Sequence, residues 1–88
     1  MNLVEQLATL PEFGEIRNLA QMTVKMVFRT NVKNLFFEEA DTPEINGFCN
    51  RIRALLKDAR ISEVPDNNND LFNQIIRPLH IFQVERSL

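Results

Sequence analysis

Side chains able to contact phosphates and base edges share one face of the segment 42–60, TPEINGFCNRIRALLKDAR. At helical spacing, the cations and amides of this face are Asn46, Asn50, Arg53, Lys57 and Arg60. Arginine and lysine bind phosphate oxygens, and arginine together with asparagine reads base edges. We predict a ligand-binding set of Asn50, Arg53, Lys57 and Arg60, with nucleic acid or a phosphorylated small molecule as ligand. The alternative is a solvated helix face whose cations pair with nearby acids.

The charge balance of the chain favours the solvated face. The chain has 10 Lys and Arg residues and 12 Asp and Glu residues, which gives a net charge of −2. Dedicated nucleic-acid binders carry a clear positive excess. No glycine-rich phosphate loop or aromatic RNA platform accompanies the basic residues. Nucleic acid or a nucleotide is therefore not the favoured partner, and we expect Ala in place of both Arg53 and Lys57 to leave fold and assembly intact.

The other reactive side chains do not form a catalytic or metal-binding set in the sequence. Cys49, the single cysteine, follows Phe48 on the apolar face of segment 42–60, which predicts a small buried hydrophobic side chain. His80, the single histidine, has no nucleophile or carboxylate placed beside it, and no His or Cys pair stands at metal-ligand spacing. The acidic run within 38–44 indicates a solvated junction between two elements. We predict no enzymatic activity, no metal and no cofactor.

The segment that carries the basic residues is the clearest helix in the sequence. Thr42 is a good N-cap residue, and Pro43 suits the first helical position. Apolar side chains recur at spacings of three and four along the face opposite the cations; they are Ile45, Phe48, Cys49, Ile52, Leu55, Leu56 and Ala59. This pattern predicts a helix over 42–60 that packs one face against other helices.

Residues 15–40 carry apolar side chains in two adjacent stripes, which favours a second long and largely buried helix. We expect the second stripe to form an interface; its residues are Val24, Phe28, Val32, Leu35 and Phe36. The alternative is a β-hairpin over 22–37, because apolar and polar residues alternate at its start, and it would make the fold α+β. Val27 interrupts that alternation, so the helix is favoured.

Short elements are predicted on either side of the two long helices. Asn2 and Glu5 resemble a capping box, and Pro11 disfavours helical geometry just before it, so the first helix is about two turns long. The polar stretch ISEVPDNNND predicts a linker over 61–70. Asp70 is the predicted cap of a last helix.

Pro78 lies inside the apolar pattern of that last helix. A proline has no backbone N–H, and its ring clashes with the carbonyl four residues earlier, here that of Gln74. The sequence therefore predicts either a kink at Pro78 or a helix that stops near Arg77 and continues as extended chain.

Together these elements predict one all-α domain over 1–88, a small bundle of about four helices of which two are long. A chain of 88 residues buries only about 60% of its unfolded surface. Two long apolar helices carry more surface than two short ones can cover, so we expect homo-oligomerisation to complete the core.

This architecture favours a small protein-protein interaction module that serves as an adaptor, structural subunit or inhibitor of a larger assembly. The alternative is an oligomeric binder of nucleic acid or a phosphorylated small molecule through Arg53, Lys57 and Arg60. A lone cysteine, the lack of a secretory pattern in MNLVEQLATLPEF and the lack of a long apolar window predict a cytoplasmic protein without membrane contact.

Overall fold

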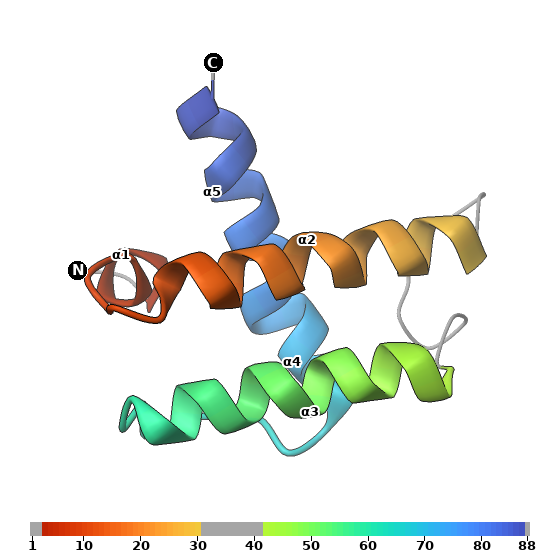
Figure 1. Cartoon of the computed structure of the whole chain (residues 1–88), viewed down its shortest axis with the longest axis horizontal. Helices are drawn as coiled ribbons and strands as arrows, with labels where there is room; N and C mark the ends of the chain where they lie inside the picture. The colour runs from red at the N-terminus through yellow and green to blue at the C-terminus, as the bar shows by residue number, and fades with distance from the viewer. Residues whose placement is uncertain (1–2, 31–41, 88) are drawn as a thin grey trace.

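The computed structural model of the chain describes residues 3–30 and 42–87, and the elements in these residues are all helical (Figure 1). They are α1 (Leu3–Ala8), α2 (Phe13–Thr30), α3 (Pro43–Asp58), α4 (Asn68–Leu71), η2 (Phe72–Ile76) and α5 (Arg77–Ser87). The all-α prediction is confirmed. The hairpin alternative over 22–37 is wrong for residues 22–30, which are helical, and its remaining residues lie outside the described residues.

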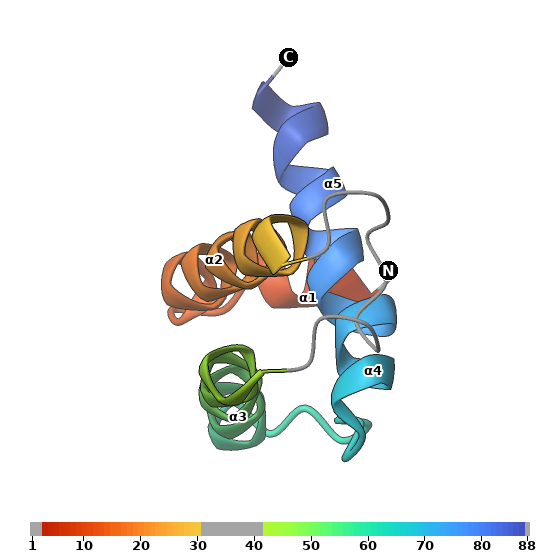
Figure 2. The ribbon, with the colours of Figure 1, turned by 90° about the vertical axis from the view of Figure 1, so that its right-hand side faces the viewer.

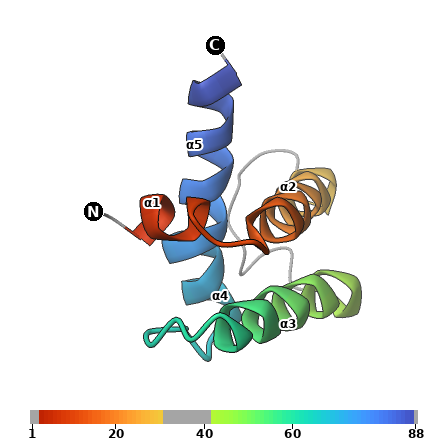
Figure 3. The same cartoon turned by 60° about the vertical axis from the view of Figure 1, so that its left-hand side comes forward.

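Helices α2 and α3 lie side by side, and a longer C-terminal helix crosses both of them (Figures 1 and 2). This C-terminal helix (residues 68–87) consists of α4, η2 and α5 without interruption. Short helix α1 packs against it and precedes α2 (Figure 3). The far end of α5 extends beyond α2 and carries the C-terminus.

Helix α2 begins two residues before the predicted start of its segment, and its described part ends at Thr30. Its buried residues keep spacings of three and four, so a single face enters the core; they are Ile16, Ala20, Thr23, Val24 and Val27. The one polar member, Thr23, donates its hydroxyl to the carbonyl of Leu19 at 2.7 Å, which satisfies a group that would otherwise be buried without a partner.

Helix α3 forms as its local signals predict. The Thr42 hydroxyl accepts a hydrogen bond from the backbone N–H of Ile45 at 3.2 Å, and Pro43 occupies the first turn. Its apolar face is buried through Ile45, Cys49, Ile52, Leu55 and Leu56.

The C-terminus of α3 is closed by a left-handed residue. Arg60 has φ of 64°, the N–H of Ile61 donates to the carbonyl of Leu56 at 3.0 Å, and the N–H of Arg60 donates to that of Lys57 at 3.0 Å. These two bonds form a Schellman motif, in which Gly normally occupies the left-handed position. Helix α3 therefore ends at Asp58, and Arg60 lies beyond it.

The residue that caps the C-terminal helix lies three residues before the predicted cap, Asp70. The side chain of Asn67, and not that of Asp70, accepts the capping bond, from the N–H of Asp70 at 3.0 Å. The predicted linker over 61–70 therefore ends at Asn67. An asparagine caps as well as an aspartate, and a run of three Asn residues offered several equivalent starts.

The C-terminal helix passes through Pro78 after a π-helical turn. In η2 the N–H of Arg77 donates to the carbonyl of Phe72, five residues earlier. This wider turn stands just before Pro78, whose missing N–H excludes the ordinary bond to the carbonyl of Gln74. The alternative in which the helix stops near Arg77 is wrong, because α5 continues to Ser87.

The core draws on every helix. Leu7 comes from α1, Ile16 from α2, Ile52 from α3 and Phe72 from η2, and all four are fully buried. The apolar faces of α2 and α3 therefore cover each other and the C-terminal helix within one chain.

Among the described residues, no helix has the length and apolar character needed to cross a membrane.

Replacing Ile52 by Asp places an unpaired carboxylate in this core, and we expect a loss of about 4 kcal/mol or more in the free energy of unfolding. The matched control is Ala54→Asp, two residues along α3 at an exposed position, which should cost about 0.5 kcal/mol through helix propensity. Urea denaturation followed by circular dichroism measures both. Equal losses for the two variants would contradict the described packing of α3.

Replacing Arg60 by Gly removes the Cβ that disfavours a left-handed backbone, so we expect this variant to be about 1 kcal/mol more stable than Arg60→Ala. The comparison with Ala separates backbone strain from loss of the guanidinium, because both variants lose the charge. The same denaturation experiment gives the difference. A glycine variant less stable than the alanine variant would mean that Arg60 does not have a positive φ.

Candidate functional site

The centre of the predicted ligand-binding set, Arg53, is bonded to its own chain. Its Nε donates to the carbonyl of Pro65 at 2.9 Å, its Nη1 to Oδ1 of Asn50 at 2.9 Å, and its Nη2 to Oδ1 of Asn68 at 2.6 Å. The side chain is half-buried. All three guanidinium nitrogens of Arg53 are therefore used inside the molecule.

A second amide extends this arrangement. Nδ2 of Asn68 donates to Oδ1 of Asn46, one turn before Asn50 on α3. We call these groups the Arg53 network: Asn46, Asn50, Arg53, the Pro65 carbonyl and Asn68. The structure thus brings together three residues of the predicted basic face, around the first residue of α4 and the connection before it.

The Arg53 network joins α3 to the start of the C-terminal helix. Hydrogen bonds to a charged group contribute roughly 1.5–3 kcal/mol, about twice as much as neutral ones. The network places Asn68 directly beside α3, and the capping residue Asn67 precedes it. Three of the five N–H groups of Arg53 are used in these internal bonds, so we assign Arg53 a structural role.

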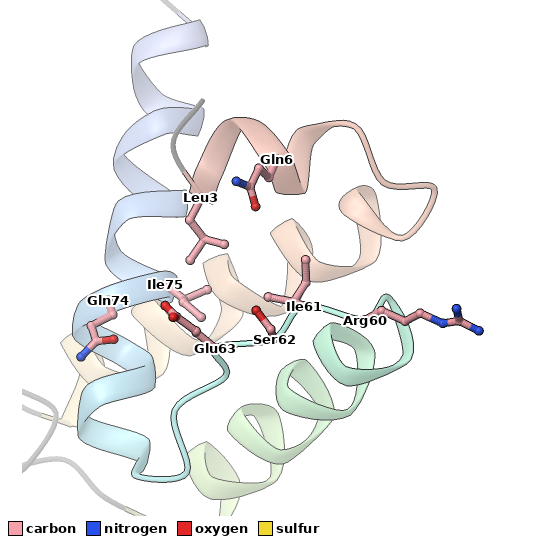
Figure 4. Close-up of a pocket in the computed structure, with 8 residues that line it drawn as sticks. All are labelled: Leu3, Gln6, Arg60, Ile61, Ser62, Glu63, Gln74 and Ile75. Carbon is pink, nitrogen blue, oxygen red and sulfur yellow. The ribbon is translucent and has the colours of Figure 1, made fainter.

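The other two predicted cations are exposed and separate from the network. Lys57 lies in the last turn of α3, where a cation complements the helix dipole. Arg60 follows the end of the helix, and its side chain extends away from the cavity described below (Figure 4). Ligand binding by Asn50, Arg53, Lys57 and Arg60 remains a prediction.

The predicted interface residues have different positions. Val24 is buried in the core of its own chain, so little of its side chain is left for a partner. Phe28, one turn later, is 60% exposed. Val32, Leu35 and Phe36 lie outside the described residues. The other exposed large hydrophobic side chains in the described part of the chain are Met22 and Ile81.

The lone cysteine and histidine occupy separate places. Cys49 is fully buried in the α3 face, as its position beside Phe48 predicts. His80 is half-buried in α5, and its Nδ1 is buried without a hydrogen-bond partner among the described residues. Within residues 3–30 and 42–87, no three His, Cys, Asp or Glu side chains are grouped closely enough to hold a metal ion.

A cavity of about 390 Å³ opens between α1, the connection after α3 and the π-helical turn η2 (Figure 4). Its lining residues are Leu3, Gln6, Arg60, Ile61, Ser62, Glu63, Gln74 and Ile75. The volume is within the range of pockets that hold small molecules, about 300–1,000 Å³. The cavity is the second candidate site of this molecule.

Sequence reasoning missed this cavity because its walls are three segments far apart in the chain. A partial signal was present, since Pro78 indicates irregular backbone at Gln74 and the polar stretch after α3 indicates a loop. Nothing in the sequence showed that α1 would lie over both.

The comparisons with known proteins found no relative of this chain. No protein-family model matches the sequence, and neither a curated protein nor a solved structure matches the chain.

Replacing Arg53 by Lys keeps the positive charge and removes the planar set of donors, and we expect a loss of about 1.5 kcal/mol or more in the free energy of unfolding. This replaces the expectation that Arg53 can be removed without effect on the fold. The control is Arg51→Lys, whose salt bridge with Glu15 (2.8 Å) joins two side chains that are 60% and 48% exposed, so it should lose less than about 0.5 kcal/mol. Similar losses for both variants in urea denaturation would contradict the structural role of Arg53.

Proposed function

We propose that the protein is a small protein-protein interaction module, an adaptor, structural subunit or inhibitor of a larger assembly, that contacts its partner through the surface of α2 around Phe28. The observation that carries this proposal is the 60% exposure of the Phe28 side chain. A phenylalanine has no polar group, so its exposed ring gains nothing from water. Burying such a ring at an interface is worth about 1.5–3 kcal/mol, and aromatic residues are enriched there.

Two further observations support contact with another protein. Met22, on the same helix, is 45% exposed, and methionine adapts its shape to a partner surface. Val24 and Val27, two apolar residues of α2 close to Phe28, are already buried in the core, so the core does not require Phe28. We propose a second copy of the chain as the first partner, in keeping with the homo-oligomer expected from the sequence.

The Arg53 network supports this function over the alternative. In a binder of nucleic acid or a phosphorylated small molecule through Arg53, Lys57 and Arg60, the central cation would have only two of its five N–H groups left beside its internal hydrogen bonds. The net charge of −2 also opposes long-range attraction of a polyanion. The proposal places the module in the cytoplasm, supported by a single cysteine without a disulfide partner.

Replacing Phe28 by Ser tests the contact surface. Because the ring is exposed and the two residues have similar helix propensity, the free energy of unfolding should change by less than about 0.5 kcal/mol. Light scattering over a range of concentrations should give a parent mass above that of one chain and a Phe28→Ser mass equal to one chain. The matched control Asn18→Ser, at an exposed position of the same helix ten residues before Phe28, should keep the parent mass.

A parent chain that stays monomeric at every concentration would exclude the second copy as partner. A photo-crosslinking residue at position 28, compared with one at position 18 in the source cell, would then test for a different protein. Crosslinks of equal strength from both positions, or none from position 28, would contradict the interaction module itself.

A further inference from the structure

Two charged residues line the cavity beside η2, and only one of them lies toward the other lining side chains. Its charged residues are Glu63 and Arg60, and the Arg60 guanidinium extends away from the other lining side chains (Figure 4). The carboxylate of Glu63 therefore gives the cavity a negative charge at neutral pH. Among the described residues it forms neither an ion pair nor a hydrogen bond.

Three uncharged polar side chains of the lining are also unused. Gln6 comes from α1, Ser62 from the connection after α3, and Gln74 from η2. In the part of the chain that the structure describes, none of these side chains makes a hydrogen bond. The uncharged groups offer donors and acceptors alike, and the Glu63 carboxylate is the group of the lining that only accepts.

The remaining lining is aliphatic. Leu3 and Ile61 are half-buried and pack on the core, and Ile75 is 1% exposed. Aliphatic walls beside acceptor groups and one negative charge match a ligand with a hydrocarbon chain and a cationic end, as a lysine side chain has.

We propose that this cavity binds a primary ammonium group on an aliphatic chain, with Glu63 as its counter-charge. An ammonium has three N–H donors and no acceptor, which suits the Glu63 carboxylate and the acceptors of Gln6 and Ser62. The hydrocarbon chain contacts Leu3 and Ile61. The group comes either from a free alkylamine or from a lysine side chain of a partner protein, since both have this chemistry.

The connection after α3, which forms one wall of the cavity, is held in place before a ligand enters. The connection is anchored at one end by the bond from the Ile61 N–H to Leu56 and at the other by the bond from Arg53 to the Pro65 carbonyl. Glu63 lies between these two anchors. A site fixed in this way avoids part of the ordering cost of binding.

The π-helical turn supplies the facing wall. Gln74 and Ile75 belong to η2, and π-helical turns are frequent at functional sites because they change the direction of side chains within a helix. Pro78 favours this geometry, since it has no N–H for the α-helical bond to Gln74.

The test is a titration of the full chain, labelled with ¹⁵N, with 1-aminopentane as the probe at constant ionic strength and pH. We expect saturable shifts of the backbone amides of Gln6, Ser62, Glu63 and Ile75, whereas 1-pentanol, which has the same chain without the charge, should bind at least about fivefold more weakly. Glu63→Gln keeps the size of the side chain and removes its charge, and should weaken the amine to the same degree. The control Glu44→Gln, at the other end of α3, should bind as the parent does.

Nα-acetyl-lysine amide distinguishes the two sources. Binding of 1-aminopentane alone assigns the cavity to a free amine, and binding of both assigns it to a lysine side chain as well. Equal binding of amine and alcohol, shifts spread over all acidic residues, or an unchanged affinity in Glu63→Gln would overturn the proposal. These outcomes are independent of Phe28, because the Phe28 proposal concerns a different surface and is measured by mass.

Discussion

Two hydrogen bonds of the Arg53 guanidinium tie α3 to the connection after it and to the first residue of the C-terminal helix, through the Pro65 carbonyl and Asn68. Helices α2 and α3 can cover each other through apolar contact alone, which is not directional. The hydrogen bond from Arg53 to Asn68 is directional, and it holds the start of the C-terminal helix beside α3. After Asn68, the same helix directs Leu71, Phe72 and Ile75 into the core, where all three are buried.

The same interaction links the fold to the cavity. The connection after α3 runs from the Schellman motif at Arg60 to the carbonyl of Pro65, and both ends are bonded to α3. Arg53, which the sequence predicts as a ligand-binding cation, instead holds one end of the connection that carries Glu63.

Local signals predicted the helices well because caps and apolar spacing act within a few residues. Thr42 and Pro43 start α3, and Ile45, Cys49 and Ile52 enter the core as their spacing requires. The role of Arg53 could not be read in this way, since two of its acceptors lie 12 and 15 residues further along the chain. The cavity depends on contacts of still longer range, between α1, the connection and η2. Phe28 was expected in an interface and is exposed, whereas Val24 of the same stripe is buried in the core.

A double-mutant cycle between Arg53 and Asn68 measures the central interaction most directly. The free energies of unfolding of the parent, Arg53→Ala, Asn68→Ala and the double variant give the coupling between the two side chains, separate from the cost of each substitution alone. The account predicts a favourable coupling of about 1 kcal/mol or more, because a charged donor and an amide acceptor meet at 2.6 Å in a half-buried place. A coupling indistinguishable from zero would mean that the two helices are held together without the Arg53 network.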